Sequence, residues 1–119
     1  MADVFEGTRE GCYLYSRHTN PSNSYLGQAI AQMEYTKGAV LSSSGMGAIT
    51  STLLQLCSSG DEIISSRTIY GGTYAFMKNY LPKFGINTTF IDSTKLEEIE
   101  SSINEKDLVW FPFPKIVMS

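Results

Sequence analysis

Two short segments rich in serine, threonine and glycine each lie between a predicted strand and a predicted helix. The first is SSSGMGAIT, residues 42–50, and the second is TIYGGT, residues 68–73. Glycine lets an anion approach the backbone closely, and the N–H groups that begin a helix have no partner within it. The N–H groups of Gly45, Met46 and Gly47 could therefore hold a phosphate, with serine hydroxyls as further donors.

The second segment adds an aromatic ring, because the side chain of Tyr70 could lie on a planar ligand. Both segments are expected at the carboxyl edge of a parallel sheet, where such sheets bind ligands. Together they favour one ligand with both a phosphate and a flat ring. Taken singly, each also fits an ordinary tight turn, because short glycine motifs are weak evidence. The first is not a Walker loop, and Thr50 stands where a third glycine would complete G-x-G-x-x-G.

The elements that would position these segments alternate between strand and helix. A first helix is predicted from Asn20-Pro21 to Gly38, with Leu26, Ala29, Ile30 and Met33 on its apolar face. Strands are then predicted over residues 39–43, 62–66, 87–92 and 108–111, and helices over 46–58, 71–81 and 95–103. Ile49, Leu53, Leu56 and Cys57, and later Tyr74, Met77, Tyr80 and Leu81, are expected to face inward. This order predicts an α/β fold with a mostly parallel sheet.

Composition argues against several classes of function. The chain has 119 residues and a formal net charge of -3, and its basic residues form no patch, so we expect no nucleic-acid or membrane partner. Two distant cysteines, Cys12 and Cys57, and one histidine give no metal-ligand spacing. Cys57 is expected to be a small buried hydrophobe. No signal peptide or membrane-spanning stretch is visible, so the expected location is cytoplasmic.

Five motifs, in this order and spacing, resemble the Cys/Met-metabolism family of pyridoxal-phosphate enzymes, which acts in transsulfuration. They are Tyr15-Ser16-Arg17, Asn20-Pro21, Ser43 to Ile49, Gly60-Asp61 and Tyr70 to Thr73. The family includes methionine γ-lyase, cystathionine γ-synthase and cystathionine lyases. The opening MADVFEG and the run LLQLCSSGD are most similar to methionine γ-lyases.

The resemblance implies the fold of aspartate aminotransferase (fold type I), of which residues 39–119 would be a partial pyridoxal-phosphate-binding domain, following an amino-terminal arm and first helix over 1–38. It implies that Gly45 and Met46 give backbone amides to the cofactor phosphate. Tyr70 would stack on the pyridine ring and assist proton transfer. Tyr15 and Arg17 would reach the phosphate of the neighbouring subunit in a homodimer within a homotetramer.

The resemblance also implies functional residues that this sequence lacks. In the family, the lysine that forms the aldimine, an aspartate for the pyridine nitrogen and an arginine for the substrate carboxylate lie downstream of Ser119. The six lysines here have no matching context, and the sequence departs from the family near Trp110, in Phe111 to Lys115. We therefore expect a truncated portion of the enzyme that is inactive alone.

Three hypotheses follow. The chain is a portion of a pyridoxal-phosphate-dependent C–S lyase or synthase, acting by elimination or γ-replacement on a sulfur amino acid that the sequence does not identify. Alternatively, it is a non-catalytic fragment or pseudogene product that at most pairs with an intact homologue. The third alternative is an unrelated nucleotide-binding α/β module, although Ser65-Ser66-Arg67 stands where that module would place an acidic residue after the second strand.

Overall fold

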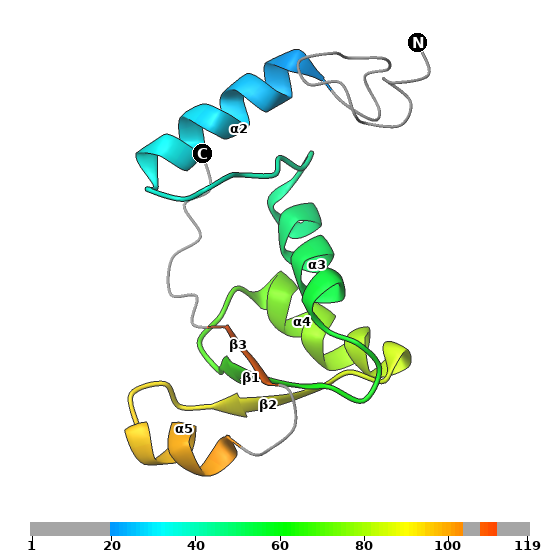
Figure 1. The fold of residues 1–119 in the computed structure, drawn as a ribbon. Coiled ribbons are helices and arrows are strands. Elements are labelled where there is room, and N and C mark those ends of the chain that lie inside the picture. The colour runs from blue at the N-terminus through cyan, green and yellow to red at the C-terminus, as the bar shows by residue number, and fades with distance from the viewer. Residues whose placement is uncertain (1–19, 104–107, 112–119) are drawn as a thin grey trace. The chain divides into compact units, whose positions relative to one another are not determined.

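The structure, a computed structural model, describes residues 20–103 and the backbone of residues 108–111. The chain divides into two units, Met1–Ser42 and Ser43–Ser119. Each is described by itself below (Figure 1). The boundary predicted between residues 38 and 39 remains a prediction.

In the first unit, helix α2 spans Pro21–Met33. It begins as predicted, because the Asn20 side chain accepts hydrogen bonds from the N–H groups of Ser22 and Asn23 and a proline occupies the first position. Its buried residues are Gly27 and Ala31. The chain returns over this small-residue face, since a Cβ on Gly27 would lie 2.9 Å from the Ala39 carbonyl oxygen.

The apolar face predicted for α2 is not the buried face of this helix in the structure. Leu26, Ile30 and Met33 are exposed, and Ala29 is half-buried. The physical reason is steric: the returning segment packs on a surface without bulky side chains, which only the Gly27 and Ala31 side of the helix offers.

The described residues of the second unit form a parallel sheet of three strands in the order β2-β1-β3. The strands are β1 (Glu62–Ser66), β2 (Asn87–Ile91) and β3 (Leu108–Phe111). Glu62 is in register with Asn87 on one side and with Leu108 on the other. Because β1 is central, its residues Ile63 to Ser66 are buried in succession instead of alternating.

Helices cover both faces of this sheet. α3 (Gly45–Leu56) and α4 (Gly71–Asn79) lie on one side, and α5 (Leu96–Ser102) lies on the other (Figure 1). The chain steps from β1 to β2 and then back past β1 to β3, so right-handed crossovers must place α4 and α5 on opposite faces. The predicted α/β fold with a parallel sheet is confirmed.

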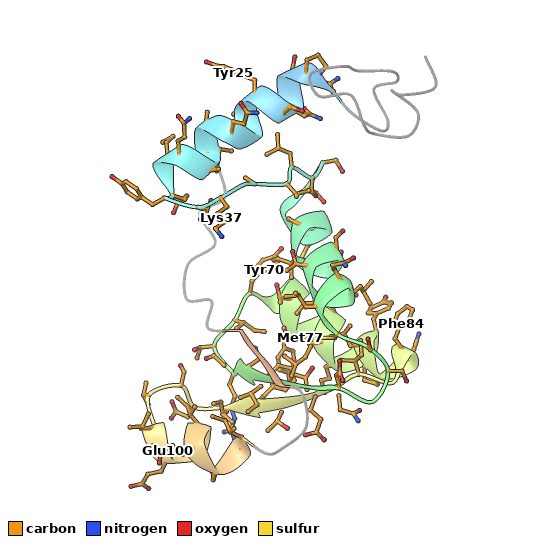
Figure 2. The ribbon with its side chains drawn as sticks, viewed as in Figure 1. Tyr25, Lys37, Tyr70, Met77, Phe84 and Glu100 are labelled. Atoms are coloured by element: carbon orange, nitrogen blue, oxygen red, sulfur yellow. The ribbon has the colours of Figure 1, made fainter. Side chains whose placement is uncertain are left out.

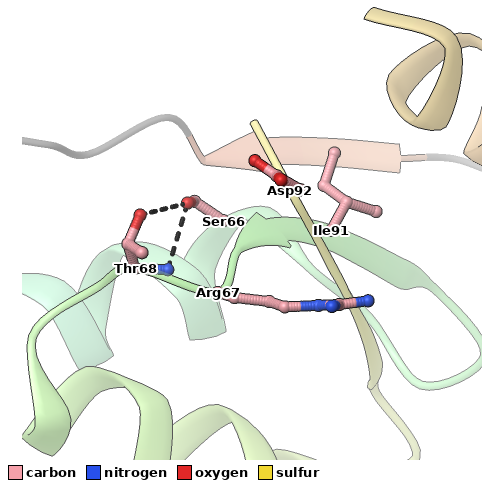
Figure 3. A pocket seen from close by; sticks show the side chains of 5 residues that line it. All are labelled: Ser66, Arg67, Thr68, Ile91 and Asp92. Carbon is pink, nitrogen blue, oxygen red and sulfur yellow. Dashed lines mark hydrogen bonds between the residues drawn. The ribbon is translucent and has the colours of Figure 1, made fainter. Parts of the chain in front are cut away.

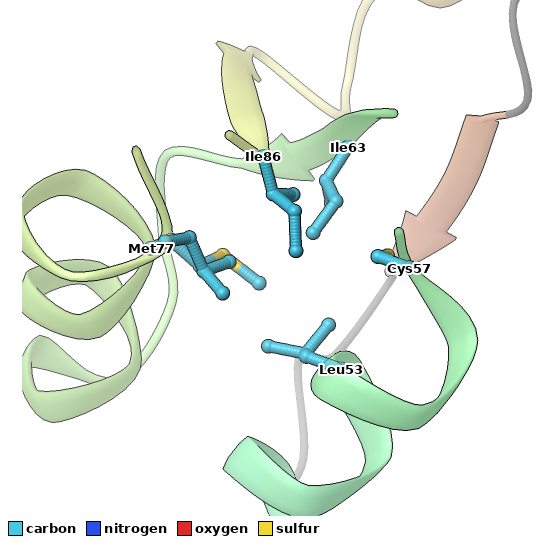
Figure 4. Close-up of a cluster of buried hydrophobic side chains, with 6 residues drawn as sticks. Leu53, Cys57, Ile63, Met77 and Ile86 are labelled. Carbon is cyan, nitrogen blue, oxygen red and sulfur yellow. The ribbon is translucent and has the colours of Figure 1, made fainter. Parts of the chain in front are cut away.

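The core lies between the sheet and the two helices on its first face (Figure 4). It consists of six buried residues: Leu53, Cys57, Ile63, Met77, Leu81 and Ile86. Burial, together with the nearby Asp61 carboxylate, raises the pKa of the Cys57 thiol, so Cys57 stays protonated and packs as a small hydrophobe, as predicted. A short 3-10 helix, η1 (Leu81–Phe84), follows α4 and ends at Gly85, whose φ is 75°.

Two further predictions are wrong. Residues 39–43 are not a strand, and Val40 is 97% exposed. A strand requires a hydrogen-bonded neighbour, and the three described strands pair only with one another. Leu56 and Tyr80, expected to face inward, are also exposed, at 56% and 54%. The residues that follow them, Cys57 and Leu81, take the buried positions in the core instead.

Candidate functional site

Helix α3 begins at a serine that caps it. Ser44 has extended backbone, with φ -156° and ψ 157°, and its hydroxyl accepts a hydrogen bond of 2.9 Å from the Gly47 N–H. The Ser44 carbonyl accepts the Ala48 N–H at 3.0 Å. The cap thus satisfies the third and fourth N–H groups after Ser44 and leaves the first two for another partner.

Those first two N–H groups belong to Gly45 and Met46. Neither has a hydrogen-bond partner within the described part of the chain. Gly45 is exposed and Met46 is half-buried, so both groups lie near the surface at the positive end of the helix dipole. This arrangement suits an anion that accepts two backbone hydrogen bonds.

Tyr70 lies beside this helix start. It immediately precedes α4, and its side chain is 52% exposed. A Cβ built on Gly72 would lie 2.7 Å from Tyr70 Cε1 and 3.3 Å from Met46 Sδ. The ring and the Met46 side chain therefore both lie against the backbone of Gly72, and the structure brings together the two segments singled out in the sequence. Tyr70 is labelled in Figure 2.

One residue of this neighbourhood was missed as a functional candidate. Thr73 is 6% exposed, and its hydroxyl donates to Met46 Sδ at 3.9 Å. The contact joins α4 to α3 across 27 residues of sequence, so no local pattern reveals it. The one available signal was a threonine three residues after Tyr70, at helical spacing.

A hollow of about 180 Å³ lies at the carboxyl ends of β1 and β2 (Figure 3). It is lined by Ser66, Arg67, Thr68, Ile91 and Asp92. The Ser66 hydroxyl lies 2.9 Å from the Thr68 hydroxyl and 3.2 Å from that of Ser93. The Arg67 Nε–H donates to the Phe90 carbonyl at 3.2 Å. These bonds tie the second segment to the sheet edge and hold the residues that lead to Tyr70.

Electrostatics at this edge favour a charged Asp92. Hydrogen bonds from the Thr94 hydroxyl and the Thr94 N–H lower the pKa of the Asp92 carboxyl, with smaller contributions from Lys95 and Arg67.

Among the described residues, no group of three or more His, Cys, Asp or Glu side chains could hold a metal ion. Within the same part of the chain, no helix is long and apolar enough to cross a membrane.

Two predicted site residues, Tyr15 and Arg17, lie outside the described residues. Their predicted contact with a neighbouring subunit's phosphate therefore stays a prediction. The roles of Gly45, Met46 and Tyr70 also stay predictions, although their positions are now defined.

Comparison with known proteins gives a consistent result. The family described as "Cys/Met metabolism PLP-dependent enzyme" matches residues 1–115. L-methionine gamma-lyase of Fusobacterium nucleatum subsp. polymorphum is 40% identical over 100 residues, which cover 84% of this chain and 25% of that protein. Methionine gamma-lyase of Arabidopsis thaliana is 44% identical over 94 residues, covering 78% of this chain and 21% of that protein.

A solved structure shows the same fold. A putative O-acetylhomoserine (thiol)-lyase from Campylobacter jejuni, crystallised with N'-pyridoxyl-lysine-5'-monophosphate, superposes with a TM-score of 0.80 and 35% identity. The match covers 88% of this chain and 26% of that one. The present chain thus spans about a quarter of the length of the proteins that it matches.

Proposed function

This chain belongs to the Cys/Met-metabolism family of enzymes that depend on pyridoxal phosphate, and from this premise we propose that it supplies the phosphate-binding turn and the ring-stacking tyrosine of such an enzyme's cofactor site. The observation that carries the proposal is the position of Tyr70. Its ring and the Met46 side chain meet over Gly72, so the ring lies beside the helix start at which the amides of Gly45 and Met46 have no partner in the described chain.

The residues present fit the cofactor. Two amides and the positive end of α3 match a phosphate dianion. A half-exposed tyrosine ring next to them matches a flat pyridine ring attached to that phosphate. In this proposal Gly45 and Met46 fix the phosphate, and the Tyr70 ring orients the pyridine. The Tyr70 hydroxyl is the group on this chain that would carry a proton to or from the substrate's leaving group.

The names of the relatives support a proposal for the reaction class. Pyridoxal phosphate, when bound, supplies the electron sink that eliminations and γ-replacements on amino acids need. One relative is named L-methionine gamma-lyase, and one similar solved structure is titled a putative O-acetylhomoserine (thiol)-lyase. We therefore propose a sulfur amino acid as the substrate class of the whole enzyme, converted by C–S elimination or γ-replacement.

The assembly is also part of the proposal. Tyr15 and Arg17 would donate to the phosphate of a neighbouring subunit, because a guanidinium and a phosphate dianion form strong paired hydrogen bonds. The site would then be completed across a homodimer, within a homotetramer in the cytoplasm. Family membership removes the alternative of an unrelated nucleotide-binding module.

The phosphate role can be tested by removing one amide without harming the helix. Gly45 is the first residue of α3, a position where proline is favoured, and the extended Ser44 before it is compatible with proline. Gly45→Pro deletes the N–H, whereas the matched control Gly45→Ala keeps it. Binding of pyridoxal phosphate and of pyridoxal is measured by equilibrium dialysis on the full chain.

We expect the unmodified chain to prefer pyridoxal phosphate over pyridoxal. Gly45→Pro should weaken the binding of pyridoxal phosphate on the order of tenfold, as for a lost hydrogen bond to a charged group. The affinity for pyridoxal should not change. Equal binding of both ligands by the unmodified chain would contradict the proposal, as would equal effects of the two variants.

A second candidate function is non-catalytic binding. The four described lysines are exposed; Lys78 and Lys83 lie over tyrosine rings, and Lys95 bonds Glu98. None of these three is directed at the helix start of α3. Borohydride reduction after incubation with pyridoxal phosphate separates the two candidates. A stable adduct on one lysine supports a catalytic chain, and weak, scattered labelling supports a chain that binds the cofactor without reacting.

A further inference from the structure

Thr73 has a buried hydroxyl with one long contact. The residue lies in the first turn of α4, is 6% exposed, and donates to Met46 Sδ at 3.9 Å. Met46 is the sole hydrogen-bond partner of this hydroxyl that the described residues provide. A threonine buried between two helices costs free energy unless its hydroxyl is bonded, so this contact is the one that makes the side chain tolerable there.

The contact lies between the two helix starts that form the candidate site. Met46 is the second residue of α3 and carries one of its two available amides. Thr73 follows Tyr70 by three residues and therefore stands on the same turn of backbone as the ring. Gly72 has no side chain, so the Met46 sulfur and the Tyr70 ring can both lie against α4 at this residue.

We propose that Thr73 is a positioning residue, which sets the spacing between the phosphate-binding amides of α3 and the ring of Tyr70 through the Met46 side chain. It touches neither cofactor nor substrate. The inference rests on the proposed function, because the spacing matters only for a ligand that carries a phosphate and a ring together.

This role predicts that a variant at Thr73 weakens the binding of a ligand in which the phosphate and the ring are joined. The binding of either group alone should not change. Inorganic phosphate needs only the α3 amides, and pyridoxal needs only the ring. Pyridoxal phosphate needs both at a fixed separation. A shift of α4 against α3 should therefore weaken the binding of pyridoxal phosphate. The affinities for inorganic phosphate and pyridoxal should not change.

The test compares Thr73→Val and Thr73→Ser with the unmodified chain. Valine keeps the shape of threonine and removes the hydroxyl, and serine keeps the hydroxyl. Affinities for pyridoxal phosphate, pyridoxal and inorganic phosphate are measured by equilibrium dialysis, and circular dichroism verifies the fold. We expect Thr73→Val to bind pyridoxal phosphate about fivefold more weakly, as for one lost hydrogen bond, with the two partial ligands unaffected and Thr73→Ser restoring the affinity.

The outcomes separate the two proposals. If the unmodified chain prefers pyridoxal phosphate and Thr73→Val binds it equally well, the positioning role is overturned and the proposed function stands. If Thr73→Val weakens the binding of all three ligands alike, the residue is merely structural and the positioning role is overturned. The same holds if Thr73→Ser is folded but does not restore the binding of pyridoxal phosphate. If the unmodified chain shows no preference for pyridoxal phosphate, both proposals fail together.

Discussion

Gly72 is the residue at which a missing side chain matters most to the candidate site. A Cβ there would lie 2.7 Å from Tyr70 Cε1 and 3.3 Å from Met46 Sδ. Both contacts involve flexible side chains, so an added methyl group would move them without disrupting the backbone. Its neighbour Gly71 differs, because a Cβ there meets nothing within 4 Å.

The pair provides a matched experiment on the position of the ring. Gly72→Ala should displace the Tyr70 ring and weaken pyridoxal phosphate binding several-fold, with a stability change of less than about 1 kcal/mol because the ring is half-exposed. Gly71→Ala should change neither. Aromatic NMR signals of Tyr70 report the ring, and dialysis reports the affinity. Unshifted Tyr70 signals in Gly72→Ala would contradict the arrangement described here.

At the scale of single elements, α2 ends in an unusual way. Tyr35 has φ 54°, and the N–H groups of Tyr35 and Thr36 bond the carbonyls of Gln32 and Ala31. This is a Schellman ending, in which the left-handed position is normally glycine. A tyrosine there carries the steric cost of its Cβ, and its side chain, 98% exposed, gains no packing in return.

Tyr35→Gly should therefore stabilise the end of α2 by about 1 kcal/mol. Hydrogen exchange of the Thr36 amide, which bonds Ala31, should slow by roughly fivefold. Tyr35→Ala is the control, because it removes the ring and keeps the Cβ. Equal exchange rates in the glycine and alanine variants would show that the backbone is not strained.

The start of α5 should be sensitive to acid. The Glu98 carboxylate accepts the Asp92 N–H at 2.9 Å and bonds Lys95, and these contacts lower the pKa of Glu98. Thr94 lowers the pKa of Asp92 in the same turn. Because both pKa values are lower in the folded chain than in the unfolded one, the stabilisation is present above the ordinary carboxyl pKa of about 4. It is lost as the pH falls through the folded values.

In a plot of unfolding free energy against pH, the acid limb is the part below about pH 4. Glu98→Gln should make this limb less steep. Glu97→Gln, which removes the same charge without touching the Asp92 amide, should leave that limb unchanged. Chemical denaturation at a series of pH values measures both. An acid limb as steep in Glu98→Gln as in the unmodified chain would refute this role.

The sequence predicted most elements of the second unit well, and the reasons are local. Ser44 before Gly45, the run around Ile63, and Pro82 with Gly85 are strong signals of a helix start, a buried strand and a helix end. Residues 39–43 have the composition of a strand, but a strand also needs a partner, which no local pattern reveals. The sequence likewise does not show which face of α2 is buried, because that depends on where the chain returns.

At the scale of the whole second unit, the buried cluster that includes Leu53 supports the helix on which the site begins. Leu53 is fully buried among Cys57, Ile63 and Met77, and it belongs to the helix that begins with the phosphate-binding turn. Leu53→Ala should cost about 2–5 kcal/mol, from lost burial and the cavity left behind. Leu56→Ala, on the same helix but 56% exposed, should change stability by no more than about 0.5 kcal/mol.

Urea denaturation of the two leucine variants measures this difference. Similar losses of unfolding free energy in the two variants would show that the core lies elsewhere.

Packing between helices also explains why one contact of the site could not be predicted from the sequence. The two segments were recognised from local patterns, but the Thr73 to Met46 contact joins residues that come together only when α4 packs on α3. The predicted contributions of Tyr15 and Arg17 depend on a second subunit.

An NMR titration of the ¹⁵N-labelled chain with pyridoxal phosphate tests whether the start of α3 binds the phosphate. We expect the amide signals of Gly45 and Met46 to shift most and the Tyr70 ring signals to shift with them, whereas pyridoxal should shift only the ring signals. Shifts centred on the lysines, with Gly45 and Met46 unchanged, would contradict the claim that this turn holds the cofactor phosphate.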